Sequence, residues 1–275
     1  MSTKLQFSVC MNIYGKDDPE HFRTALTSVL NQTVKPDQII LVVDGPIPET
    51  LDAVVREFEN REELDVIRLP ENQGLGKARG IGLAFCKYPL VAMMDADDIS
   101  VEDRFEKQLA VFAEDPAVSI VGGQIAEFID DPGHIIGDRK VPLDDRTIKN
   151  RIQSRNPINH MTVMLKLQDL LQAGGYQDWL YHEDYYLWVR MAAAGMRFAN
   201  LPQVLVNARV GEQMYQRRGG WKYFVSGYQL QKYMLDHGMS SIPMFAMNVT
   251  RRFVVQVAMP NFLRGWIYRK FARTH

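Results

Sequence analysis

The first third of the chain alternates between short apolar runs and amphipathic segments, and this alternation limits the fold more than any other feature. Four apolar runs have the length of buried strands, at residues 7–14, 38–43, 65–69 and 90–94. The segments between them carry apolar residues at helical spacing, as in Phe22, Leu26 and Val29. Strands that alternate with helices of this length predict an α/β fold of three layers around a mostly parallel central sheet.

The second half of the chain is less regular. We expect a strand at residues 119–129 and a turn after it. Helices are predicted at residues 145–155, 167–173, 183–194 and 221–237. These patterns predict an α/β domain over residues 1–215 and a helical C-terminal extension over residues 216–275, which Pro260 should kink or split.

Polar residues follow the ends of the predicted strands. Right-handed crossovers place the C-terminal ends of parallel strands at one edge of a sheet, where open α/β sheets bind their ligands. We therefore expect Tyr14, Asp44, Asn72 and residues 95–98 to lie close together.

Asp95, Asp97 and Asp98, here called the acidic cluster, follow the apolar run at residues 90–94 directly. Uncompensated charge is too costly to bury, so these side chains should not belong to the core. Carboxylate oxygens suit Mg²⁺ or Mn²⁺, which usually complete their shells with substrate phosphates. The cluster predicts a metal-bridged, phosphorylated substrate. The alternative is a solvated turn that caps a helix beginning near Val101.

Composition narrows the class of protein. The formal net charge of −1 gives no reason to expect nucleic-acid binding. Two cysteines, no apolar signal region and no apolar stretch long enough to span a bilayer predict a cytoplasmic protein.

The end of the chain departs from this neutral balance. No acidic residue follows Asp236, whereas six basic residues do, interleaved with aromatic and aliphatic ones: Arg251, Arg252, Arg264, Arg269, Lys270 and Arg273. Such a segment is typical of a helix lying on anionic lipid, here the inner face of the cell membrane. The other interpretation is a helix packed on the body with solvated arginines. The missing negative charges favour the membrane surface.

Five motifs stand in a characteristic order along the chain. They are Met11-Asn12-Ile13-Tyr14, Val43-Asp44-Gly45, Asn72-Gln73-Gly74-Leu75-Gly76-Lys77-Ala78-Arg79, Asp95-Ala96-Asp97-Asp98 and His182-Glu183-Asp184-Tyr185-Tyr186-Leu187-Trp188. With this set, residues 7–215 resemble an inverting family 2 glycosyltransferase of the GT-A, Rossmann-like fold. The resemblance implies a nucleotide-sugar donor and a saccharide acceptor.

The resemblance also implies roles for the carboxylates. Asp97 would hold Mn²⁺ or Mg²⁺, and Asp95 would contact the ribose or the metal shell. A divalent ion on the diphosphate neutralises the charge of the departing UDP. Inversion needs a base on the opposite side of the sugar, and the resemblance assigns Asp184 to it, with Glu183 positioned nearby. Alternatively, these two acids simply stabilise a helix N-terminus.

Residues that would bind the nucleotide follow the first strands: Asn12, Tyr14, Asp44, Asn72, Gly74, Lys77 and Arg79. A carboxylate at Asp44 accepts hydrogen bonds only, which suits the N3–H of uracil and favours a UDP-sugar. The family usually has two consecutive aspartates here, whereas this chain has Asp44-Gly45, and Asp44 could instead cap the next helix.

The glycine turn at residues 72–76 allows close approach of a phosphate to a helix N-terminus, although such turns are common in α/β proteins. Lys77 and Arg79 would then contact the diphosphate or the ribose.

Two further segments are candidates for substrate contacts. By resemblance, Asn159 and His160 lie near the acceptor, where they would orient its hydroxyl, although a single histidine is more often structural. Arg217 and Arg218 are flanked by glycines and could close over the diphosphate, or form a solvated loop.

The residues together predict a metal-dependent inverting transferase that moves a sugar from a UDP-sugar to a saccharide. The saccharide would be linked to a lipid, and the reaction would belong to surface polysaccharide biosynthesis. The alternatives are a nucleotidylyltransferase acting on sugar phosphates and an inactive nucleotide-sugar-binding protein. A nucleotidylyltransferase should show a glycine-rich basic loop after the first strand, and residues 15–19 contain one glycine and one lysine.

Overall fold

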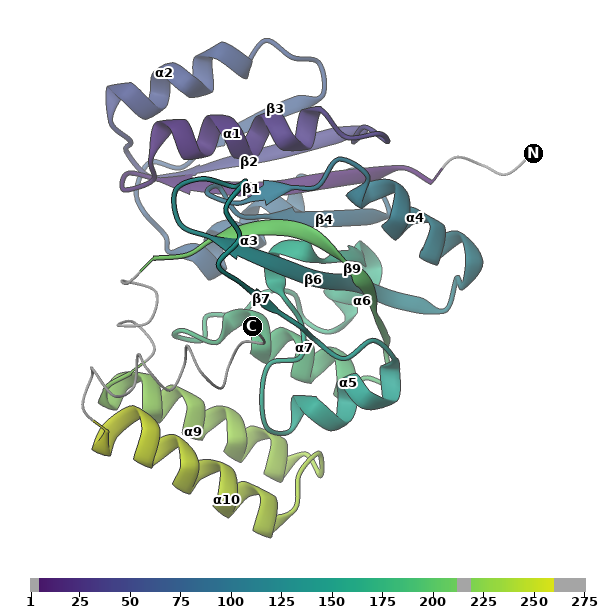
Figure 1. Cartoon of the computed structure of the whole chain (residues 1–275), viewed down its shortest axis with the longest axis vertical. Coiled ribbons are helices and arrows are strands. Elements are labelled where there is room, and N and C mark those ends of the chain that lie inside the picture. The colour runs from purple at the N-terminus through teal and green to yellow at the C-terminus, as the bar shows by residue number, and fades with distance from the viewer. Residues whose placement is uncertain (1–4, 212–218, 260–275) are drawn as a thin grey trace.

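The computed structural model describes residues 5–211 and 219–259. A twisted sheet forms the middle layer, with helices above and below it (Figure 1). The first half of the chain consists of β1 (Phe7–Tyr14), α1 (Pro19–Leu30), β2 (Gln38–Asp44), α2 (Glu49–Phe58), β3 (Leu64–Arg68), α3 (Leu75–Ala84) and β4 (Leu90–Met94). These strands lie in the order β3-β2-β1-β4 and are all parallel, so the predicted α/β architecture is confirmed.

Local sequence explains why α1 begins where it does. The Asp18 side chain accepts hydrogen bonds from the backbone N–H groups of Glu20 and His21, and Pro19 occupies the first helical position. A carboxylate at the cap and proline after it are strong helix-start signals. The five apolar residues of the expected helical face are buried against the sheet.

The second half of the chain extends the same sheet. It contains β5 (Ile99–Ser100), α4 (Arg104–Glu114), β6 (Val118–Phe128), β7 (Gly137–Arg139), α5 (Asp145–Ile152), a 3₁₀ turn (His160–Thr162), β8 (Met164–Lys166), α6 (Leu167–Gln172), α7 (Glu183–Ala193) and β9 (Arg197–Arg209). β8 runs antiparallel to both β4 and β6, whereas β9 runs parallel to β6. The sequence patterns did not indicate β9, whose pairing with β6 is interrupted by shifts in register.

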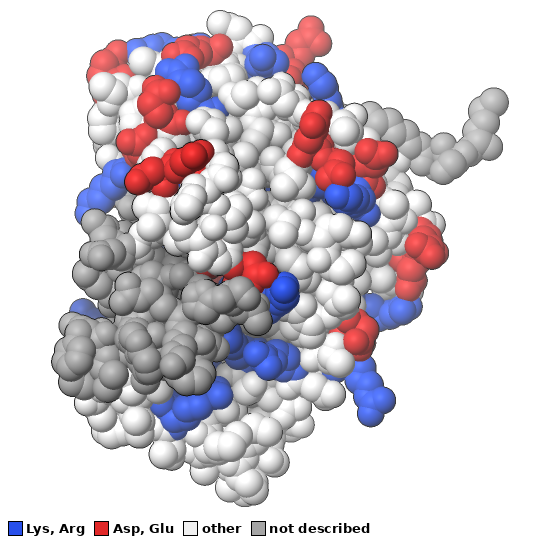
Figure 2. Space-filling view, in the orientation of Figure 1, with Lys and Arg blue, Asp and Glu red and all other residues white. Residues whose placement is uncertain are grey.

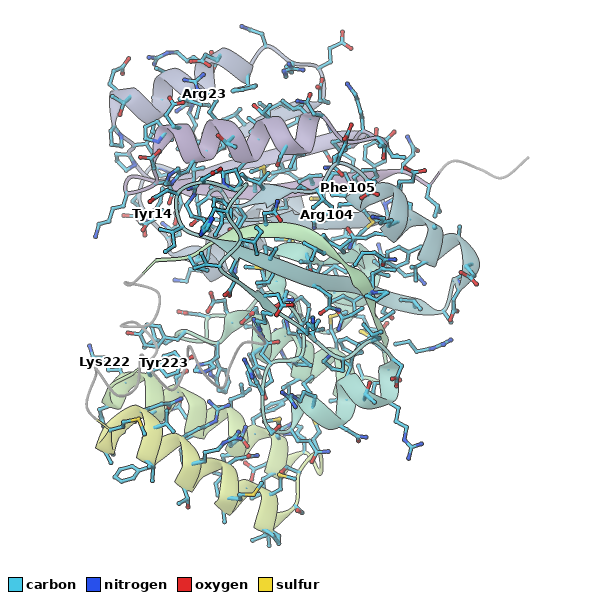
Figure 3. The ribbon with its side chains drawn as sticks, in the orientation of Figure 1. Tyr14, Arg23, Arg104, Phe105, Lys222 and Tyr223 are labelled. Carbon is cyan, nitrogen blue, oxygen red and sulfur yellow. The ribbon has the colours of Figure 1, made fainter. Side chains whose placement is uncertain are left out.

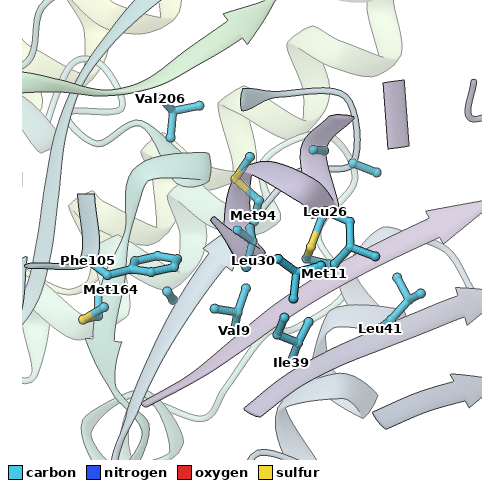
Figure 4. Close-up of a cluster of buried hydrophobic side chains, with 14 of the residues drawn as sticks. Val9, Met11, Leu26, Leu30, Ile39, Leu41, Met94, Phe105, Met164 and Val206 are labelled. Atoms are coloured by element: carbon cyan, nitrogen blue, oxygen red, sulfur yellow. The ribbon is translucent and has the colours of Figure 1, made fainter. Parts of the chain in front are cut away.

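Two apolar cores hold the layers together. Figure 4 shows the first, in which Met11, Ile39 and Met94 of the parallel strands meet Leu26 of α1 and Phe105 of α4. The second core lies on the other face of the sheet around the fully buried Trp188 of α7. Because this core contains residues of both the sheet and α7, it fixes the C-terminal ends of the central strands relative to α7.

The C-terminal extension forms a helical hairpin of α9 (Trp221–Asp236) and α10 (Ile242–Phe253), followed by a π-helical turn (Val254–Ala258). Leu230 and Met234 of α9 are fully buried in the second core, so this helix packs on the body. None of the helices within residues 5–211 and 219–259 is both long and apolar enough to cross a membrane. Pro260 and most of the basic tail lie outside the described residues.

Gly45 provides a test of the contact between the end of β2 and the loop at residues 71–74. Its φ is +85°, and a Cβ there would lie 2.5 Å from the backbone nitrogen of Asn72. We expect Gly45→Ala to lower the free energy of unfolding by about 2 kcal/mol or more, because it adds strain and a backbone clash. Urea denaturation measures this change. Gly80→Ala is the control, since a Cβ on Gly80 meets nothing within 4 Å. Equal losses in both variants would contradict this account.

Candidate active site

The ends of the parallel strands bring the predicted polar residues together. Tyr14 of β1 is the register partner of Asp44 of β2, and residues 95–98 follow β4 on the other side of β1. Figure 3 shows Tyr14 at this end of β1. The expected convergence at one sheet edge is therefore present in the structure.

Asp44 holds the glycine loop against the end of β2. Its two carboxylate oxygens accept backbone hydrogen bonds from Gln73 at 2.7 Å and Gly74 at 3.1 Å, and its carbonyl accepts one from the Asn72 side chain. The cap position of α2 is Pro48, so the idea that Asp44 caps that helix is wrong. The carboxylate keeps lone pairs for a further donor, because each oxygen can accept about two hydrogen bonds.

The glycine loop leads directly into α3, whose first turn lies close to the start of α7. Gly74, with φ +83°, occupies the cap position of α3 and supplies no side-chain cap. A Cβ on Gly76 would lie 3.6 Å from the carbonyl oxygen of Gln177 and 3.8 Å from the Cβ of Glu183. Lys77 is exposed in this turn and remains available to a phosphate.

Arg79 has a different position from the expected diphosphate or ribose contact. Its side chain is buried, with Nη2 2.9 Å from Oδ1 of Asp95 and Nη1 3.7 Å from Oε1 of Glu183. Burial, the largest single cause, would raise the pKa of Asp95, but the charge and hydrogen bond of Arg79, together with the charges of other neighbouring groups, outweigh it and hold that pKa below its ordinary value. Arg79 thus joins the strand side of the site to α7.

The acidic cluster divides into three environments. Asp97 is exposed, Asp95 is partly exposed beside Arg79, and Asp98 is only 2% exposed. The Asp98 carboxylate accepts the backbone N–H of Arg209 at 2.8 Å, so the expectation that all three side chains avoid the core is wrong. Because α4 begins at Arg104, Asp98 does not cap that helix either. Burial, followed by the charges of Asp97 and Asp95, raises the pKa of Asp98 well above its ordinary value.

A fourth carboxylate, Asp17, lies at the same edge and was missed in the sequence. It follows β1 and accepts the backbone N–H of Tyr14 at 2.9 Å. Burial, together with the charges of Asp97 and Asp95, raises the pKa of Asp17 to about 6. Its position just after the end of the first predicted strand was the sequence signal that could have identified it as a site residue.

These carboxylates fit a divalent ion that is shared with a substrate. Among the described residues, no group of three or more His, Cys, Asp or Glu side chains has the arrangement to enclose a metal by itself. Mg²⁺ is commonly held by one or two carboxylates together with substrate phosphates. The exposed Asp97, with Asp95 nearby, has the donor chemistry for that arrangement.

The first turn of α7 presents the other pair of acids. Asn156 donates to Oδ2 of Asp184 at 2.9 Å, and the backbone N–H of Tyr185 lies 2.6 Å from Oδ1 of Asp184. Burial and the neighbouring charge of Asp184 raise the pKa of Glu183. Leu187, Trp188 and Met191 are fully buried and anchor α7 in the second core.

Asn159 and His160 lie beneath the site. Asn159 is fully buried, and its side-chain amide donates to the backbone carbonyl of Gly123 at 2.8 Å. His160 places Nε2 2.7 Å from the Tyr176 hydroxyl and Nδ1 3.8 Å from Asp95 Oδ1. Burial, with the charge of Arg79, lowers the pKa of His160 to about 4, so the ring is neutral near pH 7.

Three orphaned polar atoms lie at these residues. Nδ2 of Asn12, Oδ1 of Asn159 and Nδ1 of His160 are buried without a hydrogen-bond partner in the described part of the chain. Such atoms are rare in proteins and suit a site whose remaining partner is a ligand. Arg217 and Arg218 lie outside the described residues.

Comparison with known proteins identifies the class of enzyme to which the chain belongs. A model of the glycosyl transferase family 2 matches residues 8–174. A Haemophilus influenzae protein described as an uncharacterized glycosyltransferase is 41% identical over 98% of this chain and 100% of its own length. The Escherichia coli UDP-Gal:alpha-D-GlcNAc-diphosphoundecaprenol beta-1,3-galactosyltransferase is 34% identical over 98% of this chain and 97% of its own length.

Solved structures confirm the fold. Staphylococcus aureus TarS superposes with a TM-score of 0.68 and 16% identity over 96% of this chain and 48% of that chain, so our chain spans about half of it. The mannosyltransferase PcManGT of Pyrobaculum calidifontis gives a TM-score of 0.62 with 15% identity, over 93% of this chain and 71% of its own.

The fold and the converging carboxylates define a glycosyltransferase of the GT-A architecture. The chain belongs to glycosyl transferase family 2. This assignment favours sugar transfer over the nucleotidylyltransferase alternative.

Buried, neutral His160 should make the fold sensitive to acid. In the unfolded chain a histidine titrates near 6.5, whereas the pKa of folded His160 is about 4. Between these values the unfolded state binds more protons, so stability falls as the pH falls, by up to about 3 kcal/mol. We expect the free energy of unfolding to fall less between pH 6.5 and pH 4 in His160→Gln than in the wild type, as measured by urea denaturation. The exposed His134→Gln is the control, and the same reduction there would refute the assignment.

Proposed function

We propose that this glycosyltransferase is metal-dependent and inverting, and transfers a sugar from UDP to a lipid-linked saccharide in surface polysaccharide biosynthesis. The observation that carries the proposal is the position of Arg79 between Asp95 and Glu183. This buried guanidinium brings the metal-binding edge of the sheet and the acidic turn of α7 into one site. The groups that act on the donor and on the acceptor can then lie on opposite sides of the same sugar.

The donor proposal rests on the end of β2 and the loop at residues 72–77. Asp44 keeps lone pairs for the uracil N3–H, which cytosine lacks. The exposed Lys77 and the start of α3 offer positive charge and backbone N–H groups to a diphosphate. TarS has been crystallised with UDP and with UDP-GlcNAc, whereas PcManGT was crystallised with GDP-Man and Mn²⁺. An acceptor at Asp44 would disfavour cytosine, and the UDP complexes of TarS and the UDP-Gal donor in the name of the E. coli relative favour UDP for this chain.

Asp97, assisted by Asp95, would hold the divalent ion. When bound, the ion supplies positive charge that stabilises the departing diphosphate. Arg79 keeps Asp95 ionised and fixes its orientation, so that the carboxylate needs no rearrangement when the donor arrives.

Asp184 is the proposed general base. The hydrogen bond from Asn156 to Oδ2 orients its carboxylate, and the backbone bond to Oδ1 holds the helix start. The acceptor hydroxyl would give its proton to this carboxylate as it attacks the anomeric carbon. Glu183, tied to Arg79, has a positioning role.

The acceptor proposal follows from the relatives. The E. coli relative acts on α-D-GlcNAc-diphosphoundecaprenol, and an Erwinia amylovora relative, 39% identical over 83% of this chain and 85% of its own length, is the amylovoran biosynthesis glycosyltransferase AmsE. We propose a sugar linked to a lipid diphosphate as the acceptor here. The presence of both carboxylate pairs argues against an inactive binding protein.

Asp184→Asn tests the base. We expect kcat to fall by about 10²–10⁴-fold, because the amide accepts no proton, while UDP affinity stays the same. Transfer is measured with the UDP-sugar that a donor screen selects, and binding by calorimetry. The exposed, remote Asp236→Asn is the matched control. Normal turnover in Asp184→Asn would remove this residue as the base.

Calorimetric titration with UDP, with and without Mn²⁺, tests the donor and the metal. We expect UDP to bind more tightly than GDP or CMP, and Mn²⁺ to strengthen binding, because Asp97 would hold the ion and the ion would supply positive charge to the diphosphate. In Asp97→Asn the strengthening by Mn²⁺ should disappear while weak binding without metal remains. A preference for GDP would discard Asp44 as the uracil ligand.

A further inference from the structure

The α9–α10 hairpin has an exposed apolar surface, here called the hairpin face. It consists of Trp221, Tyr228, Ile242, Met247, Phe253 and Val254. Ile242 is 72% exposed and Trp221 is 62% exposed, which is unusual for large apolar side chains. Trp221, Tyr228 and Phe253 are joined into one patch, since all three rings pack on Phe224. A contiguous exposed apolar patch marks a docking site in soluble proteins.

The two helices of the hairpin carry mostly positive charge. Lys222 and Arg251 are exposed on the two helices, and the chain has no acidic residue after Asp236, which is itself paired with Lys232. On the side shown in Figure 2, the lower end of the molecule over α9 and α10 is white and blue, whereas acidic side chains gather mostly above it. Apolar and basic side chains together match the headgroup region of an anionic bilayer.

The hairpin also holds the segment that precedes the acids of α7. Ser226 of α9 donates to the carbonyl of Leu180, and its hydroxyl lies 3.1 Å from Nδ1 of His182. The indole N–H of Trp179 donates to the Ser226 carbonyl at 3.4 Å. Glu183 follows this segment directly, so α9 fixes where α7 begins.

The second helix holds the loop that orients Asp184. The fully buried Asn248 of α10 donates to the carbonyl of Gln153 at 2.9 Å, and Arg251 donates to that of Ser154 at 3.2 Å. Asn156, two residues further on, donates to Asp184. Both segments that border Asp184 therefore rest on the hairpin.

The hairpin begins on the side of the molecule where the site lies. Figure 3 shows Lys222 and Tyr223, at the start of α9, on the same side as Tyr14 at the end of β1. Trp221 and Phe253 lie at this same end of the hairpin, since both rings contact Phe224.

We infer that the hairpin face docks on an anionic lipid bilayer and sets the height of Asp184 above it. That this height suits the acceptor rests on the proposed function, because a sugar on a lipid diphosphate stays within reach of the headgroups. A second copy of the chain is a poorer occupant. A two-fold contact through this face would place Lys222 and Arg251 against the same cations, without acids to pair them.

Sedimentation of the full chain with lipid vesicles tests the docking. We expect binding to vesicles containing phosphatidylglycerol, weaker binding to phosphatidylcholine alone, and loss of binding as salt is raised. The double variant Ile242→Glu, Met247→Glu should bind at least about tenfold more weakly, because it places two charges in the apolar contact. Leu171→Glu is the matched control, since Leu171 is 52% exposed on α6. Lys222→Gln should weaken binding about fivefold.

Several outcomes overturn the inference. Unchanged vesicle binding in the double variant, or equal binding to neutral and anionic vesicles, would remove the hairpin face as a lipid contact. A wild-type dimer that the double variant converts to monomer would assign the face to a second copy. Size-exclusion chromatography with light scattering measures that state.

The docking test is separate from the test of the proposed function, because vesicle binding needs neither donor nor metal. The double variant should keep its turnover on a short-chain, water-soluble acceptor and lose it on acceptor embedded in vesicles. Loss on both acceptors would count against the inference. Normal docking of wild type without any sugar transfer would instead count against the proposed function.

Discussion

The site depends on one buried cation. Arg79 lies under the sheet edge and contacts Asp95 at the end of β4 and Glu183 at the start of α7. Removing one partner of a buried ion pair typically costs about 3–5 kcal/mol, so neither carboxylate is easily replaced. The charge of Arg79 adds to burial in lowering the pKa of His160, and it helps to keep Asp95 ionised. One guanidinium therefore fixes both the geometry and the protonation of the two halves of the site.

The sequence predicted the parallel half of the fold and its functional edge well. Buried strands have a strong local signal, and crossover handedness then determines where residues such as Tyr14 and Asp44 meet. The roles of Arg79 and Asp98 could not be predicted in this way. Whether a charged side chain faces solvent or a buried partner depends on tertiary contacts, here with Glu183 and with the backbone of Arg209.

The same limit applies to the second half of the chain. β9 is long but bulged and only partly buried, so no regular alternation marked it as a strand. The basic C-terminal segment suggested two exclusive interpretations, packing on the body or contact with lipid. In the structure, α9, which precedes that segment, buries Leu230 and Met234 while the hairpin face stays exposed, and most of the basic segment lies outside the described residues.

Part of the hold that the hairpin has on the two segments beside Asp184 is through their main chain. Ser226, Asn248 and Arg251 all donate to backbone carbonyls, at positions 180, 153 and 154. Carbonyls are the same in every amino acid, so the side chains at those positions are free to vary while the loops keep their places. Evolution can therefore change the side chains at positions 153, 154 and 180 without rebuilding the scaffold that holds Asp184, the proposed base.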